Sequence, residues 1–498
     1  MMSLYKSTDV ELLSQNIDNI QDEIKNIQAV LFEPTKKEQE NVTEIILDFL
    51  RTAKRKIYGG YALNMLIVDK DPKDAIYKPI DSPDIDFYSP EPIQDLIKIC
   101  NMLYDKGFKS VTGKEAMHTE TYSIFVNQKL YCDISYVPRN IYSRMPFKEI
   151  KGIQVIHPYF MTVDYLRMLS DPLVSYWRIE KAFKRFVLLQ NHYPLPHNEN
   201  PINIEENTTN LQYALDAISD YIQDKQSIIS IGFYAYNYFL NTSNICNDKN
   251  KEVSKFKLLN VPYYEIISTN YRDDALELLK VLRERFSADP KIVTHVEHYP
   301  FFQFWGHSVR VFVEGELVAI MYHHNKKCIP YFDVPYYKFE NGKAEKTNKK
   351  VRLGSFSITL LYALIAVMKS RTDNNEDDRN LYHTIISHLI EMRNFYLSKE
   401  KKTIFDETLF RDFIIRCVGD TIMPEREKRL IIEQRKKANK KFIFSYDPST
   451  TLKEADTNYV FSNSSGNPIN NIKNLKLADN IPSKSIQEEI IEEESEKN

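Results

Sequence analysis

The sequence predicts an α/β (α+β) fold in which one arrangement of strands and helices occurs twice in tandem, with flanking helices. Alternating apolar and polar residues predict strands over 84–88 and 129–137, and residues 93–106 have the apolar spacing of an amphipathic helix. The motif at 58–64, which contains glycine, tyrosine, alanine and asparagine at fixed spacing, returns at 231–237. With 498 residues, 43% of them hydrophobic, the chain can bury several cores, so two to four domains are expected.

The N-terminal part predicts two helices before the first strands. Residues 5–31 carry apolar side chains at helical spacing, and Pro34 ends this helix. A second helix over 38–54 leads into a glycine turn. Strands over 122–126 and 129–137 predict a hairpin.

The rest of the chain predicts mainly helices around the second copy of the motif. Residues 158–189 read as two helices broken near Pro172, and the polar stretch 192–210 reads as a connector. Further helices are expected over 355–368, 381–397 and the basic stretch 425–441. From about residue 447 the polar, finally acidic composition predicts disorder.

Three aspartates form the first candidate site. In an extended strand, Asp84 and Asp86 point to one face while Ile85 and Phe87 point to the other. Asp133 lies in a second alternating strand and completes a triad if the two strands pair. Carboxylate oxygens grouped in this way suit Mg²⁺ or Mn²⁺, and two such ions can serve in-line phosphoryl transfer.

The repeat predicts that only the first half can hold metal. Its match continues beyond the glycine motif, because 261–268 aligns with 82–89 and 311–320 aligns with 124–133. The aligned positions pair Asp84 with Tyr263, Asp86 with Glu265 and Asp133 with Ile320. The second half therefore reads as a degenerate copy that lacks two of the three acids.

Phosphate contacts are expected at the glycine turn and on one cationic helix face. Gly59 and Gly60 precede a helix, and a helix N-terminus without intervening Cβ atoms favours anions. Arg178, Lys181 and Arg185 recur at helical spacing and could neutralise a triphosphate.

Each of these features also has a structural interpretation. An Asp-x-Asp pair in a strand or a Gly-Gly pair alone is often plain surface or turn chemistry, and the cationic face at 178–185 could simply be solvated. Trp177 could stack on a base but reads more readily as a core or interface residue. The basic stretch 425–441 could follow RNA phosphates or form a soluble face. We also expect structural roles for His295, His298, His323 and His324.

Composition limits the class of protein. The formal net charge of −3 neither indicates nor excludes a nucleic-acid partner. The five cysteines are scattered and odd in number, which argues against a disulfide framework and a zinc site and favours a reducing compartment. No apolar h-region follows the N-terminus and no run of 18 apolar residues occurs, so neither secretion nor a membrane span is expected.

The motifs at 57–62, 82–88 and 133–136 resemble those of the polymerase β-like nucleotidyltransferase superfamily. Their fuller context resembles the poly(A) polymerase catalytic subunits of large cytoplasmic DNA viruses, of the giant-virus (mimivirus) type and related to the poxvirus enzymes. The resemblance spans residues 1 to about 445. It implies Asp84, Asp86 and Asp133 as the catalytic, metal-binding acids, with Gly59 and Gly60 facing the triphosphate.

The resemblance implies template-independent addition of AMP from ATP to the 3′ end of mRNA, with release of pyrophosphate. It also implies a homodimer acting in the host cytoplasm, in the viral factory, or packaged in the virion. We expect an N-terminal helical extension (1–37), a catalytic nucleotidyltransferase domain (38–200), a degenerate second domain with C-terminal helices (201–446) and a disordered tail (447–498). Two alternatives stay open: a nucleotidyltransferase acting on another acceptor, and a non-catalytic RNA-binding protein on the same fold.

Overall fold

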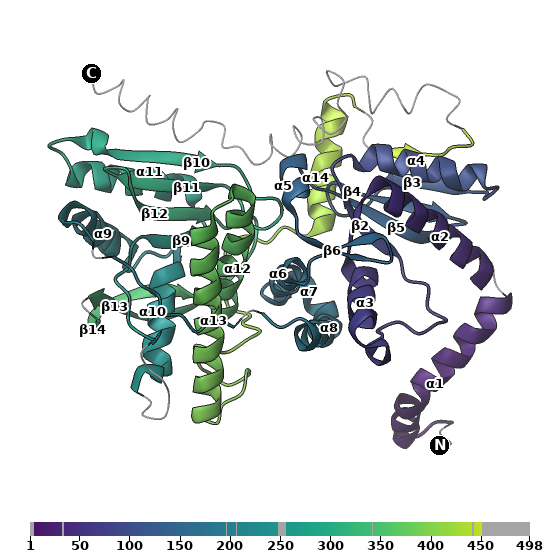
Figure 1. Ribbon diagram of the computed structural model, residues 1–498, viewed down its shortest axis with the longest axis horizontal. Coiled ribbons are helices and arrows are strands. Elements are labelled where there is room, and N and C mark those ends of the chain that lie inside the picture. The colour runs from purple at the N-terminus through teal and green to yellow at the C-terminus, as the bar shows by residue number, and fades with distance from the viewer. Residues whose placement is uncertain are drawn as a thin grey trace. The chain divides into compact units, whose positions relative to one another are not determined.

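A computed structural model gives the fold of each half of the chain (Figure 1). It describes residues 4–31, 34–195, 197–205, 207–247, 255–340, 342–440 and 443–450. These residues form two compact units, of which the first comprises 4–157 with 424–450 and the second 158–423. In the described part of the chain each unit is built around an eight-stranded sheet with helices, so the predicted α/β class is confirmed.

The first unit contains the predicted N-terminal helices and the strands with the aspartates. Its helices are α1 (Ser7–Leu31), α2 (Lys36–Ala53), α3 (Gly59–Lys70), η1 (Pro72–Asp74), α4 (Pro92–Asp105), α5 (Arg139–Arg144) and α14 (Pro424–Lys437). Its strands are β1 (Lys56–Tyr58), β2 (Ile85–Ser89), β3 (Val111–Glu115), β4 (Thr121–Val126), β5 (Lys129–Tyr136), β6 (Phe147–Ile150), β7 (Ile153–Ile156) and β16 (Ser445–Tyr446).

The order of strands in the first sheet is β16-β3-β4-β5-β2-β1-β7-β6. The expected hairpin is present as β4 and β5, and β5 pairs in parallel with β2. Helices α2 and α4 contact each other and the strands of this sheet. Helix α2 begins at a capping box formed by Thr35 and Glu38 and buries an apolar stripe that includes Ile46 and Leu50, so both local signals and packing fix its position.

The described part of the second unit begins with five helical segments before its own sheet. Its helices are α6 (Pro158–Leu169), α7 (Pro172–Ser175), η2 (Tyr176–Arg178), α8 (Ile179–His192), α9 (Thr209–Ile222), α10 (Gly232–Ser243), η3 (Ile245–Asn247), α11 (Tyr271–Arg285), η5 (Pro290–Ile292), α12 (Phe356–Asp373) and α13 (Glu376–Lys399). Its strands are β8 (Ile228–Ile231), β9 (Tyr264–Ser268), β10 (Val293–His298), β11 (Ser308–Val313), β12 (Glu316–His323), β13 (Ile329–Glu340), β14 (Lys343–Gly354) and β15 (Cys417–Val418).

The second sheet repeats the topology of the first. Its order is β10-β11-β12-β9-β8-β14-β13-β15, so β3-β4-β5-β2-β1-β7-β6 corresponds to β10-β11-β12-β9-β8-β14-β13. Corresponding pairs run in the same sense, since β2 with β5 and β9 with β12 are parallel, whereas β1 with β2 and β8 with β9 are antiparallel. The predicted duplication is therefore present in the backbone itself.

Details of side-chain bonding repeat as well. The Ser89 hydroxyl donates to the Asp95 carboxylate at 2.5 Å, and the Ser268 hydroxyl donates to Asp274 at 2.5 Å at the equivalent place in the second unit. In each unit this serine is the last residue of the acid-bearing strand, and the aspartate lies in the first turn of the next helix, where a carboxylate stabilises the helix dipole.

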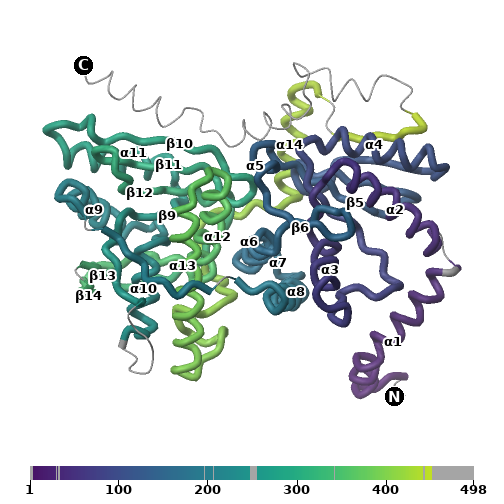
Figure 2. The backbone as a smooth tube through the Cα atoms, in the orientation of Figure 1, coloured from purple at the N-terminus to yellow at the C-terminus, as the bar shows by residue number. Residues whose placement is uncertain are grey.

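Residues 424–450 belong to the first unit, and Figure 2 shows α14 beside its strands. Strand β16 pairs with β3, and α14 supplies Lys428 and Arg435 to Glu115 at 3.1 and 2.8 Å. Burial raises the pKa of Glu115, but the two cations outweigh it, so its pKa lies below the usual value. The sequence did not predict this contact, because an ion pair between residues 320 positions apart leaves no local signal.

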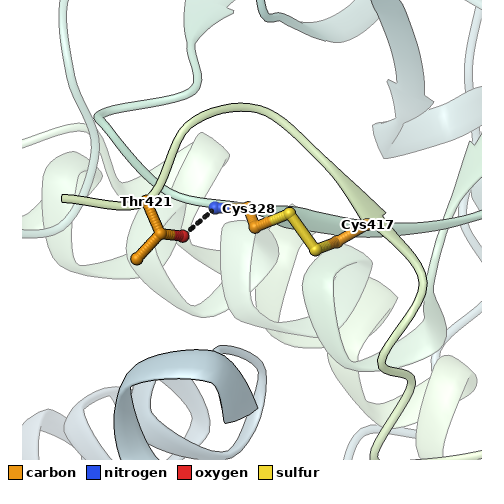
Figure 3. The surroundings of a disulfide bond; sticks show 3 residues. All are labelled: Cys328, Cys417 and Thr421. Atoms are coloured by element: carbon orange, nitrogen blue, oxygen red, sulfur yellow. Dashed lines mark hydrogen bonds between the residues drawn. A yellow bond between two sulfur atoms is a disulfide. The ribbon is translucent and has the colours of Figure 1, made fainter. Parts of the chain in front are cut away.

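A disulfide joins Cys328 to Cys417 in the second unit, so the expectation that all cysteines are reduced is wrong for this pair (Figure 3). The two residues lie 89 positions apart and meet because β15 pairs with β13 at Ile329 and Pro330. Only the sheet brings them together, so their spacing in the sequence carried no signal. Cys100, Cys132 and Cys246 are free.

Of the other predictions, some are confirmed, some are wrong and some are untested. The break near Pro172 is confirmed, although α7 and η2 separate the two long helices there. Trp177 is 66% exposed, so it is not a core residue, and its role as an interface residue stays a prediction. The predicted disordered tail from residue 447 lies outside the described residues, apart from 447–450, and the sequence-based domain boundaries stay predictions.

Candidate functional site

Strand pairing brings the three aspartates together. Strands β2 and β5 are parallel, and their register places Asp86 directly beside Asp133. Asp84 lies just before β2, two residues ahead of Asp86. One carboxylate oxygen from each of the three lies within 4.8 Å of the others. The expected triad therefore exists as a geometric group.

The triad carries negative charge in a partly buried place. Burial raises the pKa of Asp86 well above its usual range, and the carboxylates of Asp84 and Asp133 raise it further. The pKa of Asp133 is also raised, chiefly by burial and less by Asp84, against the lowering effect of a hydroxyl donor. A divalent cation would relieve this repulsion, and an all-oxygen donor set fits Mg²⁺ or Mn²⁺.

Ser123 is a member of the site that the motifs did not indicate. It lies opposite Asp133 in the β4–β5 hairpin, and its hydroxyl donates to the Asp133 carboxylate at 2.5 Å. The bond fixes the orientation of that carboxylate and partly offsets its burial. The register of the hairpin could have revealed the pairing, since the residue opposite an acid is determined once the turn is placed.

The glycine turn lies directly against the triad. Helix α3 begins at Gly59, whose φ of +73° lies in the left-handed region. A Cβ added there would come within 3.0 Å of the Asp86 carboxylate, closer than real Cβ atoms approach. Position 59 therefore requires glycine, because any side chain there would collide with the Asp86 carboxylate. Tyr58 precedes the helix without capping it, and its hydroxyl forms a hydrogen bond with the Ser135 hydroxyl at 2.9 Å. Contact of Gly59 and Gly60 with a phosphate stays a prediction.

The predicted cations lie in the second unit. Arg178 ends η2 just before α8, and its guanidinium stacks over the Trp177 ring at 4.0 Å. Burial lowers the pKa of Arg178. Lys181 is exposed and Arg185 is half-buried on α8. The contact of these three with a triphosphate stays a prediction.

The equivalent place in the second sheet has a different chemistry. Strands β9 and β12 pair in parallel with Glu265 beside Ile320, as the sequence repeat predicts. Gly232 has a φ of +60°, and a Cβ there would lie 2.5 Å from the Glu265 carboxylate. The hydroxyls of Tyr382 and Tyr322 donate to Glu265 at 3.0 and 3.3 Å. Burial raises the pKa of Glu265 to about 7, so this carboxyl holds a proton more readily than an ordinary one.

Among the described residues, only the aspartate triad groups three or more potential metal ligands. The histidines expected to be structural lie outside it, and burial lowers the pKa of His323 to about 4, which keeps that ring neutral at pH 7. Within the described chain, the helices are too short or too polar to cross a membrane.

Comparisons with known proteins identify the family of this site. Residues 44–175 match the family model "Poly(A) polymerase catalytic subunit", and residues 188–479 match "APMV, Putative poly(A) polymerase, catalytic subunit, C-terminal". The chain is 34% identical over 487 residues to the "Putative poly(A) polymerase catalytic subunit" of Acanthamoeba polyphaga mimivirus, which covers 93% of this chain and 83% of that relative. The chain belongs to the poly(A) polymerase catalytic subunit family.

Further relatives agree with this assignment. A crystal structure of the Megavirus polyadenylate synthase matches with a TM-score of 0.81 at 34% identity, over 96% of this chain and 91% of that one. A "Putative poly(A) polymerase catalytic subunit" of African swine fever virus (isolate Pig/Kenya/KEN-50/1950) is 28% identical over 165 residues, or 32% of this chain and 34% of that protein. The chain is thus a nucleotidyltransferase of the poly(A) polymerase type, and the family implies ATP as substrate and a divalent metal.

Proposed function

We propose that this enzyme adds AMP from ATP to the 3′ end of viral mRNA without a template, releases pyrophosphate and uses two divalent metal ions. The observation that carries the proposal is the triad of Asp84, Asp86 and Asp133, whose ligand atoms lie within 4.8 Å of one another at the edge of the glycine turn. When bound, a pair of Mg²⁺ or Mn²⁺ ions would activate the 3′ hydroxyl and stabilise the triphosphate and the leaving pyrophosphate.

The residues of the site divide this work. Asp86 and Asp133 are neighbours on paired strands and, together with Asp84, would hold the divalent ions. Ser123 holds Asp133 in place through its hydroxyl. The first N–H groups of α3, at Gly59 and Gly60, can donate to a phosphate oxygen without interference from side chains.

Cations are also needed to neutralise the triphosphate, and we assign this role to Arg178, Lys181 and Arg185. Lys184 offers a matched control on the same helix, because it already pairs with Glu180 at 2.7 Å. Replacing Lys181 by alanine should raise the KM for ATP by about three- to tenfold, in line with an exposed charge contact. An equal KM for ATP in Lys181→Ala and Lys184→Ala would show that Lys181 does not contact the triphosphate.

RNA phosphates are the proposed ligands of the exposed face of α14. Lys428 and Arg435 are engaged with Glu115, whereas Arg426, Lys436 and Lys437 are exposed. Phosphate neutralisation by this face predicts RNA affinity that falls steeply with salt, since each contact releases counterions. An affinity that is insensitive to salt would contradict this role.

Primer extension tests the proposed reaction. The full chain is incubated with Mg²⁺ or Mn²⁺, a labelled single-stranded RNA and each nucleoside triphosphate separately. We expect long products with ATP only and none with EDTA. Failure to extend RNA with ATP would contradict the proposal, whereas efficient transfer of one or a few residues to a tRNA end or a protein would favour the alternative acceptor.

Two further parts of the proposal concern the oligomeric state and the location of the enzyme. We expect a homodimer, which the molar mass in solution tests. We also expect a location in the viral factory of the host cytoplasm or in the virion. Immunofluorescence of infected cells and analysis of purified virions test the location. Staining of the nucleus alone would contradict it.

A further inference from the structure

Helix α1 carries a continuous apolar stripe that faces solvent. Its apolar residues alternate at spacings of three and four along the helix, which is the a/d pattern of a coiled coil sustained over three heptads. The members of this α1 seam are Val10, Leu13, Ile17, Ile20, Ile24, Ile27 and Leu31. Six of them are 40–72% exposed, and Ile17 is half-buried. A contiguous apolar stripe of this kind that is exposed to water indicates a surface for contact with another helix.

The rest of the first unit holds α1 by its opposite side. Asp22 pairs with Lys78, and Lys25 pairs with Asp81 at 3.2 Å. With Ile17 and Ile24 at a positions, Asp22 falls at f and Lys25 at b, both away from the seam. Docking of α1 on its own unit therefore leaves the seam available.

We propose that the α1 seam pairs with the α1 seam of a second copy of this chain as a coiled coil. This inference specifies the contact of the homodimer proposed above. A dimer formed through another surface would leave that proposal standing and overturn this one. The pairing does not depend on the catalytic reaction.

The seam fits a second copy because its repeat is complementary to itself. Each a or d side chain of a coiled coil inserts between four residues of a helix with the same period, and another α1 supplies that period over the same length. The helix is about 33 Å long from Val10 to Leu31, at 1.5 Å per residue.

Charges beside the seam permit this pairing. The e positions are Ser14, Gln21 and Gln28, and the g positions are Asp9, Asn16 and Glu23. In a parallel pair each g residue faces the e residue of the next heptad, so Asp9 meets Ser14 and Glu23 meets Gln28 without opposing like charges. RNA is a poor occupant, because the helix has five acidic residues and one lysine, and the seam itself is apolar.

The oligomeric state of the full chain tests the proposal. Light scattering and sedimentation equilibrium over a range of concentrations are compared for the wild type, Ile24→Glu and the matched control Leu12→Glu. Leu12 is 56% exposed on the same helix at a c position, outside the seam. We expect dimeric wild type and Leu12→Glu, and a dissociation constant raised at least about tenfold in Ile24→Glu, because a charge would be buried in the seam.

A second variant separates loss of the seam from loss of the helix. Alanine is the best helix former, so Ile20→Ala/Ile24→Ala keeps α1 helical while it removes seam contacts. This variant should also dissociate, with unchanged far-UV circular dichroism and unchanged extension of a short primer per chain. A monomeric wild type, or dimers of Ile24→Glu and of the double alanine variant that are as strong as those of the wild type, would overturn the proposal.

Discussion

The acid site of the first sheet and its counterpart in the second are built on the same framework. Each has a carboxylate on the strand that pairs in parallel with the edge of a hairpin, Asp86 in one and Glu265 in the other. Each carboxylate lies against a left-handed glycine at the start of a helix, Gly59 or Gly232. The framework alone therefore does not make a metal site.

The neighbours of the shared carboxylate make the difference. Asp133 stands beside Asp86 on the adjacent strand, whereas Ile320 stands beside Glu265. The second carboxylate is instead enclosed by tyrosine hydroxyls, including that of Tyr382 from α13. The comparison teaches that a carboxylate on the same framework can lie either in a group able to hold a metal ion or in a hydrogen-bonded core, depending on whether its neighbours are acidic or are apolar and aromatic.

The largest expected effect comes from matched amide substitutions at the two positions. Asp86→Asn removes a charged ligand from the triad and should lower the rate of primer extension by at least about a thousandfold. Glu265→Gln changes a group outside the triad and should leave the rate within about twofold. Rates are measured under single-turnover conditions with saturating ATP. Similar losses in both variants would remove the functional distinction between the two sites.

The two glycines should respond differently although their geometry is the same. Gly59→Ala would force a methyl group against Asp86 and should reduce activity by at least about tenfold, because the left-handed backbone and the triad are both disturbed. Gly232→Ala would press on Glu265 and should destabilise the second unit by about 1–3 kcal/mol. Thermal unfolding and primer extension of both variants check this contrast. A Gly59→Ala enzyme with full activity would contradict it.

A smaller effect is expected in the pH dependence of stability. The pKa of Glu265 is raised by burial to about 7, whereas an unfolded glutamate has a pKa of about 4.3. Between these values the folded chain keeps a proton that the unfolded chain has lost, so stability falls as pH rises through this window, by up to about 4 kcal/mol. Glu265→Gln should abolish this slope.

The measurement is the apparent Tm of the wild type and of Glu265→Gln between pH 5 and pH 8, without metal in both cases. Asp86 has a raised pKa too and contributes a slope of the same sign, but it does so equally in both proteins. The difference between the two curves therefore reports Glu265. Parallel curves would show that Glu265 is not buried as a protonated group.

Much of this comparison could be predicted from the sequence because it rests on periodic patterns. Alternation placed Asp84 and Asp86 on one face, and the repeat aligned Glu265 and Ile320 with the acids before any pairing was known. The parallel register of β9 with β12 puts those two residues side by side. Alternation along a strand and a repeat between two halves can both be read from the order of the residues alone.

The remaining features depend on contacts between distant segments. Tyr382 reaches Glu265 from α13, 117 residues away, and Cys417 reaches Cys328 across 89 residues. Arg435 returns to Glu115 from the C-terminal helix. These contacts cannot be predicted from sequence periodicity, because each results from the packing of whole helices and strands. Ser123 lies between the two cases, since its contact with Asp133 follows from a hairpin register that the sequence suggested but did not fix.

Direct measurement of metal binding tests the central claim, which is that only the first site holds divalent ions. Free Mn²⁺ is followed by electron paramagnetic resonance during titration of the wild type, Asp86→Asn and Glu265→Gln. We predict the same binding curve for the wild type and Glu265→Gln, and an affinity at least about tenfold weaker for Asp86→Asn. Undiminished binding in Asp86→Asn, or a loss of binding in Glu265→Gln, would contradict the account.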